Sequence, residues 1–190
     1  MNEKLFIPKQ EVVPTLGEQG LKIAEKLVGD WREQLGSDVE VVLGGSLLSG
    51  LFVASEDTKV IDMDVRFLTD TPDDVQLREK ITQVTGLTYR KTITVVDWPE
   101  GTSSAHMLED VREVDGLSLP LEIEGCLRNR NYVGWAKYWP QVLSEEELDD
   151  VRRKKQELRH DKQAYKAYKD GILAEVKKRV VERGLLEKPE

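Results

Sequence analysis

The stretch that decides the fold reads LGGSLLSGLFVASEDTKVIDMDVRF, residues 43–67. A β-rich run ends at two glycines and a serine, and a second apolar run then carries Asp62 and Asp64 one residue apart. An unpaired charge buried in an apolar segment is strongly unfavourable. Because residues i and i+2 of a strand point to the same face, both carboxylates project together while the apolar residues between them face a core. The stretch therefore predicts a strand with one apolar and one acidic face.

A divalent metal ion would account for this pair of acids. Two adjacent carboxylates repel each other, so the pKa of one rises unless a cation lies between them. A hard ion such as Mg²⁺ or Mn²⁺ takes oxygen ligands and removes that cost. The alternative is that the D-x-D pattern, which is common, lies on a solvated face of an edge strand. Asp62 and Asp64 are candidate metal ligands on this interpretation.

The residues before the acidic strand predict a phosphate-binding turn. Gly44 and Gly45 end a strand over residues 39–43, and Ser46 is a good N-cap for a short helix over residues 47–53. Glycines let phosphates approach the backbone N–H groups at a helix N-terminus, and a serine hydroxyl can donate to a phosphate oxygen. A plain strand-to-helix turn is the alternative. Beside a carboxylate strand, the turn indicates phosphoryl transfer, which needs both a phosphate cradle and metal ions.

The remaining patterns predict one α+β domain over residues 1–140 and a helical C-terminal segment over residues 141–190 packed on it. Asp115-Gly116 is a strong hairpin signal, and Ser144 followed by three glutamates is typical of a capping-box helix start. Three aromatic residues, Trp135, Tyr138 and Trp139, are expected to anchor the C-terminal helix. The expected elements are helices over residues 16–34, 47–53, 73–86 and 144–184, the last interrupted near Asp170-Gly171, and strands over residues 39–43, 60–68, 87–96, 107–114 and 117–127.

Composition limits the function classes. The 190 residues carry a formal net charge of −8, which gives no overall attraction to nucleic acid or to an anionic membrane. No run approaches membrane-spanning length, so we expect a soluble cytoplasmic protein without a membrane partner. Cys126 is the only cysteine and is expected in the core, which fits a reducing compartment. His106 and His160 lack partners at ligand spacing, so zinc is not expected.

LGGSLLSGLF followed by VIDMDVRF resembles the signature of the nucleotidyltransferase superfamily, the DNA polymerase beta-like fold. That signature is an apolar residue, Gly, Gly or Ser, a variable helix and loop, and then acid–apolar–acid–apolar on the next strand. The resemblance covers residues 39–127, and its one departure is a longer gap that contains the polar loop 55–59. It implies a mixed β-sheet flanked by helices. It also implies metal-dependent transfer of a nucleoside monophosphate from ATP or another NTP to an acceptor hydroxyl, with release of pyrophosphate.

The resemblance also implies a third acid on a later strand, which completes the metal site and helps to deprotonate the acceptor hydroxyl. The sequence LSLPLEIEGCL offers Glu122 as the first choice and Glu124 as a close second on the same strand face. Pro120 would restrict this strand to an edge or a bulge. The alternative is that both glutamates line a solvated hairpin face.

The implied ligands of the NTP lie around the glycine turn and the acidic strand. Arg66 is in phase with the two aspartates and either neutralises them or contacts phosphate. The implied catalytic and metal-binding residues are Asp62, Asp64 and Glu122, and the implied nucleotide-binding residues are Gly44, Gly45, Ser46 and Arg66.

Several questions stay open at the level of sequence. A catalytically silent module of the same fold, which binds a nucleotide or a protein partner, is the alternative function, and a (p)ppGpp synthetase-like pyrophosphokinase is a more distant one. The acceptor is a small molecule, a protein side chain or an RNA end, and the nucleobase and the oligomeric state are not given. The basic helix that starts near Arg152 is either a solvated surface or an acceptor-binding surface for tRNA or another nucleic acid.

Overall fold

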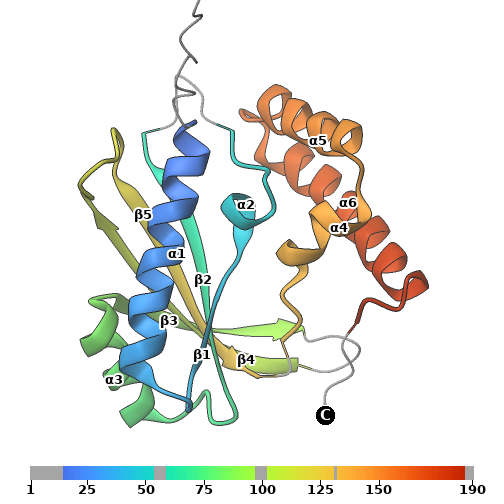
Figure 1. The fold of residues 1–190 in the computed structure, drawn as a ribbon. Coiled ribbons are helices and arrows are strands. Elements are labelled where there is room, and N and C mark those ends of the chain that lie inside the picture. Colours follow the sequence, from blue (N-terminus) through green and yellow to red (C-terminus); the bar gives the residue numbers. More distant parts are fainter. Residues whose placement is uncertain (1–14, 54–58, 97–101, 131, 187–190) are drawn as a thin grey trace, which may run out of the picture.

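A computed structural model describes residues 15–53, 59–96, 102–130 and 132–186. Its strands form one five-stranded mixed sheet in the order β1-β2-β5-β4-β3 (Figure 1). The strands are β1 (Glu40–Leu43), β2 (Ile61–Thr69), β3 (Thr88–Val96), β4 (Thr102–Arg112) and β5 (Leu121–Asn129). The acidic strand of the sequence is β2, and it lies inside the sheet between β1 and β5.

The pairing of β2 with β5 is parallel, whereas the other three pairings are antiparallel. In this register Asp62 lies opposite Glu122, and Asp64 lies opposite Glu124. β5 is the central strand of the sheet, so the expectation that Pro120 confines it to an edge is wrong. Pro120 immediately precedes the first residue of β5, where no ladder N–H is needed, and its carbonyl accepts a hydrogen bond from Ile61 N at 2.8 Å.

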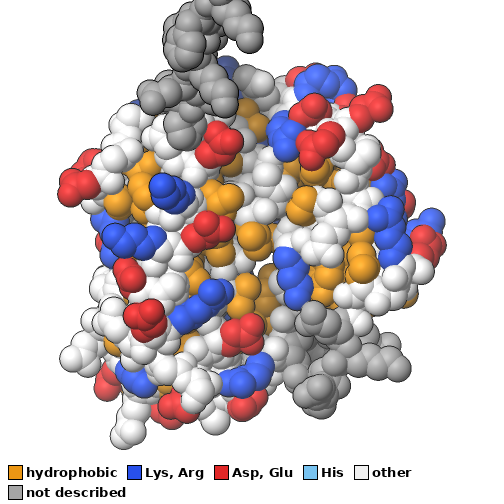
Figure 2. Space-filling view, viewed as in Figure 1, with side chains coloured by type: hydrophobic (Ala, Val, Ile, Leu, Met, Phe, Trp, Pro, Cys, Tyr) orange, Lys and Arg blue, Asp and Glu red, His pale blue; other side chains and the backbone are white. Residues whose placement is uncertain are grey.

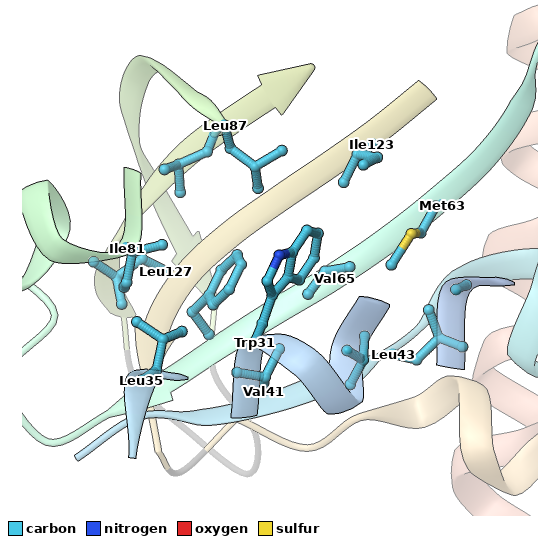
Figure 3. Close-up of a cluster of buried hydrophobic side chains, with 14 of the residues drawn as sticks. Trp31, Leu35, Val41, Leu43, Met63, Val65, Ile81, Leu87, Ile123 and Leu127 are labelled. Atoms are coloured by element: carbon cyan, nitrogen blue, oxygen red, sulfur yellow. The ribbon is translucent and has the colours of Figure 1, made fainter. Parts of the chain in front are cut away.

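Helices α1 (Leu16–Leu35) and α3 (Val75–Thr85) cover one face of the sheet (Figure 1). Thr15 caps α1 through a capping box with Glu18. In Figure 3, Trp31 of α1 lies among side chains of β2 and β5. This is the main core, because the apolar residues of both strands are buried there, and they include Ile61, Met63, Val65, Leu121 and Ile123. The alternating residues of β2 and β5, the acids among them, therefore face the opposite side of the sheet.

The C-terminal helices form a second apolar cluster. They are η1 (Trp135–Tyr138), α4 (Trp139–Val142), α5 (Glu145–Glu157) and α6 (Lys162–Glu182). Tyr138 and Trp139 are buried in this cluster and Trp135 packs against it, so the predicted aromatic anchors are confirmed. Leu51, which follows α2 (Gly45–Leu48), is buried in the same cluster and joins it to the glycine turn. Figure 1 shows α2 between α1 and the pair α5 and α6, and Figure 2 shows acidic and basic side chains interleaved over that pair.

Several boundaries differ from the predicted ones. The antiparallel neighbours β4 and β5 are joined by residues 113–120 rather than by a two-residue turn at Asp115-Gly116, because pairing resumes only at Leu121, after Pro120. The C-terminal helix breaks before α6 because the Asp161 side chain accepts from Ala164 N and starts a new helix. Gly171 lies inside α6, where it is tolerated. Residues 55–58 of the predicted polar loop fall outside the described residues.

Candidate active site

Four carboxylates gather on the face of the sheet opposite α1. Asp62 and Asp64 project from β2, and Glu122 and Glu124 project from the adjacent β5 in the same register. The parallel pairing therefore brings together acids that are 60 positions apart in the sequence. This confirms that the acidic residues of both motifs share one sheet face, and it places the two candidates for the third acid side by side.

Burial and neighbouring negative charge raise the pKa values of two of these carboxylates, Asp62 and Glu124. Desolvation by the surrounding protein is the largest cause of a raised pKa at Asp62, and the charge of Asp64 adds to it. Lys155 and a side-chain hydrogen bond with Glu122 act in the opposite direction. The pKa of Glu124 is also raised, first by desolvation and then by its neighbouring carboxylates. Ionisation of these carboxylates is therefore unfavourable in the folded protein. A bound cation would relieve that cost.

The glycine turn packs directly against Asp64. Gly44 N donates a hydrogen bond to Asp64 O at 2.8 Å, which ties the turn to β2. Gly45 has a φ of 66°, and a Cβ placed on it would overlap the Asp64 carboxylate. A side chain at position 45 would therefore have to displace that carboxylate. Glycine is needed here for both the backbone conformation and the close approach.

The start of α2 differs from the prediction. Gly44, not Ser46, is the N-cap of α2, and no side chain caps the helix. The helix ends at Leu48 rather than near residue 53, because Gly50 has a positive φ and Leu51 N donates to Ser46 O instead of continuing the helix. Ser46 thus lies in the first turn of α2 rather than at the cap.

Arg66 lies two residues beyond Asp64 on the same face of β2. One of its guanidinium nitrogens, Nη2, is 3.4 Å from Asp64 Oδ1, and Nη1 donates to Val65 O at 3.0 Å. The side chain is partly buried, with a relative exposure of 22%. Its positive charge offsets part of the negative charge of the cluster, because it opposes the rise in the pKa of Glu124.

Lys155 of α5 is a site residue that the sequence interpretation missed. Its ammonium donates to Leu51 O at 3.4 Å and lies close enough to Asp62 and Asp64 for their charges to interact with it. Desolvation is the largest cause of its lowered pKa. A signal was present in the sequence: Lys155 is seven residues after Leu148 and four after Val151, so it falls on the buried stripe of its helix.

Arg152, one turn earlier on α5, also hydrogen-bonds the segment that follows α2. Its Nε donates to Gly50 O at 2.7 Å. Together, Arg152 and Lys155 bind the two carbonyl groups that follow α2, so the C-terminal helices fix the position of the glycine turn from outside the sheet.

The donor atoms of the acidic face are all carboxylate oxygens, which suit Mg²⁺ or Mn²⁺. Within the described part of the chain, no three His, Cys, Asp or Glu side chains are drawn together tightly enough to form a metal-binding set. Asp62 and Asp64 with Glu122 or Glu124 have the composition of such a set and share one face of the sheet.

Other reactive side chains are held in the protein interior. His106 is buried and hydrogen-bonds Thr92 Oγ1 at 2.9 Å and Asp73 Oδ1 at 3.0 Å. Cys126 is buried on β5, and desolvation raises its thiol pKa. Cys126 is therefore a core residue, as the sequence predicted, and His106 is buried as well.

Two cavities lie away from the carboxylates. One of about 600 Å³ lies between α5 and α6, and one of about 330 Å³ lies beside the start of β1. None of the candidate site residues lines either of them. The chemistry of the acidic face, not the size of a cavity, marks the candidate site.

The topology is a mixed sheet flanked by helices with a helical C-terminal segment, which is the fold class that the sequence predicts. No protein-family model matches the chain, and no curated protein matches it. Among the described residues, no helix is both long and apolar enough to span a membrane.

Two solved structures are similar to the chain. One is a cytoplasmic RNA terminal U-transferase, with 14% identity, a TM-score of 0.42 and 75% of this chain covered. The other is Cid1 in complex with its short product ApU, with 16% identity, a TM-score of 0.38 and 70% covered. The match spans 38% of the length of each. At this distance a match assigns no activity, so the function has to be inferred from the site.

Proposed function

We propose that the chain is a metal-dependent nucleotidyltransferase, which transfers a nucleoside monophosphate from an NTP to an acceptor hydroxyl and releases pyrophosphate. The observation that carries the proposal is the contact between Gly45 and Asp64, which places a glycine turn and a carboxylate cluster at one point. A phosphate held by the turn would lie next to the acids. Phosphoryl transfer needs that juxtaposition.

Each residue has a distinct task in this proposal. Asp62 and Asp64 would hold Mg²⁺ or Mn²⁺, with Glu122 as the third acid and Glu124 as its rival. A bound divalent ion would neutralise charge on the NTP and lower the pKa of the acceptor hydroxyl. The carboxylate left free of the ion accepts the proton of the attacking hydroxyl. Arg66 limits the repulsion within the acid cluster.

The triphosphate would be held from two sides. The backbone N–H groups of Gly45 and Ser46 face it from α2, and the Ser46 hydroxyl adds a donor. Lys155 would approach from α5, where its ammonium already interacts with Asp62 and Asp64. On this proposal residues 1–140 form the transferase domain, and residues 141–190 form a segment that completes its site. We also propose a cytoplasmic location, which suits the buried free thiol of Cys126.

Labelling with [α-³²P]NTPs tests the reaction. Each of the four NTPs is incubated with Mg²⁺ or Mn²⁺ and one of three acceptors: a short RNA, casein or an aminoglycoside. We expect label in one acceptor class. Asp62→Asn and Asp64→Asn should each lower the rate about a hundredfold or more, because each removes a ligand of the charge-neutralising ion. Parallel Glu122→Gln and Glu124→Gln variants identify the third acid by the larger loss.

Asp70→Asn is the matched control, because Asp70 is exposed just beyond the other end of β2 and loses the same charge. It should keep full activity. Full activity in Asp62→Asn, or an equal loss in Asp70→Asn, contradicts the mechanism. Mg²⁺-dependent NTP binding without labelling of any acceptor would instead support the silent module.

A further inference from the structure

Ser49, the C-cap residue of α2, is a buried polar residue, with only 3% of its surface exposed. Its hydroxyl donates a hydrogen bond to the carbonyl oxygen of Gly45 at 2.9 Å, and its backbone N–H donates to the same oxygen at 3.2 Å. A buried hydroxyl is unfavourable unless it has a hydrogen-bond partner. Ser49 therefore has its partner in the glycine turn.

The identity of the acceptor residue gives this hydrogen bond its importance. Serine hydroxyls in helices often bind the carbonyl four residues earlier, so the bond by itself indicates only local structure. Here the carbonyl belongs to a glycine with a φ of 66°, and glycine has more backbone conformations available to it than any other residue. Gly44 N–H ties the turn to Asp64 O from the other side. The Ser49 hydroxyl thus restrains the most adaptable residue of the turn.

Gly45 is also the residue against which the Asp64 carboxylate packs. Asp64 Oδ2 occupies the place where a Cβ of residue 45 would lie, and Asp64 Oδ1 is 3.4 Å from Arg66 Nη2. The two oxygens of one candidate metal ligand therefore face different neighbours. A shift of the Gly45 backbone would change the space open to Oδ2, and with it the orientation of the carboxylate.

We propose that Ser49 is a positioning residue of the candidate active site. Its hydroxyl fixes Gly45, and Gly45 fixes the orientation in which the Asp64 carboxylate meets a divalent metal ion. This inference rests on the proposed function, because it concerns how that site holds its metal. Removal of a group that orients a metal ligand directly lowers metal affinity by about 10- to 100-fold. Ser49 acts through one intervening residue, so we expect a smaller change.

Titration of the full chain with Mn²⁺ tests the inference without a nucleotide or an acceptor. Free Mn²⁺ is measured by electron paramagnetic resonance, and the unfolding temperature of each variant is measured in parallel. Ser49→Ala should weaken Mn²⁺ binding about fivefold, because Gly45 and the Asp64 carboxylate are held less firmly. Ser49→Thr should restore the affinity, since a threonine hydroxyl can also bind the carbonyl four residues earlier.

Thr85→Val is the matched control for a purely structural role. Thr85 is also 3% exposed, and its hydroxyl donates to Ile81 O, again four residues earlier, at 2.7 Å. It lies at the end of α3, which covers the opposite face of the sheet from the carboxylates (Figure 1). Ser49→Ala and Thr85→Val should both lower the unfolding temperature, because each loses a buried hydrogen bond. Only Ser49→Ala should weaken Mn²⁺ binding.

The outcomes separate this inference from the proposed function. If Mn²⁺ binding depends on the Ser49 hydroxyl but the wild-type chain labels no acceptor, the positioning role stands and the transferase does not. If the wild-type chain labels an acceptor but Ser49→Ala binds Mn²⁺ as tightly as wild type, the positioning role alone is rejected.

Three further results would overturn the positioning role. In the first, Thr85→Val weakens Mn²⁺ binding as much as Ser49→Ala does. In the second, Ser49→Thr unfolds at the wild-type temperature but binds Mn²⁺ no better than Ser49→Ala. In the third, the wild-type chain binds no Mn²⁺, a result that would also contradict the proposed function.

Discussion

The carboxylate of Asp64 fills the space into which a side chain at Gly45 would project. No other described glycine with a positive φ meets a carboxylate in this way. The contact joins the two halves of the motif that the sequence carries, although 18 residues separate them.

The first prediction concerns this contact. Gly45→Ala should destabilise the fold by about 3 kcal/mol or more, because it combines left-handed backbone strain with displacement of Asp64. Gly116→Ala is the control, since Gly116 also has a positive φ but open space around it. It should cost only about 1–2 kcal/mol and keep NTP binding. Thermal unfolding and NTP titration measure both effects, and equal losses in the two variants would refute the steric role of Asp64.

The second prediction concerns the acidic cluster without metal. The pKa values of Asp62 and Glu124 lie above 3.8 and 4.5 in the folded protein, so the folded state holds these protons more tightly than the unfolded chain. The stability gained from binding these protons is therefore fully present below the ordinary pKa values of 3.8 and 4.5. It is lost as the pH rises through the raised pKa values of the folded protein. At pH 7 with EDTA, Asp62→Asn and Glu124→Gln should each raise the unfolding temperature by about 2 °C. An unchanged or lower unfolding temperature would show that ionised Asp62 and Glu124 do not destabilise the metal-free fold.

The third prediction concerns the bond from Arg152 to the carbonyl of Gly50. Arg152→Ala should speed amide exchange at Gly50 and Leu51 about tenfold, because the segment after α2 loses its anchor to α5. In an active preparation it should raise the KM for NTP more than it lowers kcat, because the turn is positioned less firmly. Arg153→Ala is the control, since Arg153 is an exposed neighbour whose ion pairs with Asp150 and Glu157 lie within α5. Identical exchange in both variants would contradict the anchoring role.

The fourth prediction concerns the attachment of α6 to α5. Arg179 contacts Glu147 at 2.8 Å and, with the Ser144 backbone N–H, lowers the pKa of Glu147 to about 2. The stability that this depressed pKa provides is present above about pH 4.5 and is lost as the pH falls towards 2. Glu147→Gln should flatten the fall in unfolding temperature over that range, whereas Glu146→Gln in the same helical turn should not. If the unfolding temperature of Glu147→Gln fell with pH as it does in the wild-type protein, the Glu147–Arg179 pair would not contribute to stability.

Local sequence patterns predicted most of the fold. The alternation on β2 and the glycine pair identified a strand and a turn, because both depend on residues close together in the chain. The central position of β5 was not predictable from Pro120, since a proline just before a strand looks the same as a proline within an edge strand. Asp161 was missed as a cap because the lysines around it continue the helical composition without interruption.

The candidate site was predictable only in part. The four acids were visible as two i, i+2 pairs, but their shared register depends on a parallel pairing that no local pattern encodes. Lys155 was hidden in the run Arg152 to Lys155, in which only helical phase separates the inward residue from the exposed ones.

The parallel pairing of β2 with β5 also affects the order in which the carboxylate cluster forms during translation. Asp62 and Asp64 emerge from the exit tunnel before β5 has been synthesised, and Lys155 follows later still. A nascent chain that stops before residue 121 has only half of the carboxylates and lacks the central strand on which β2 and β4 both pair. The complete set of four carboxylates therefore forms late in translation, together with closure of the sheet rather than ahead of it.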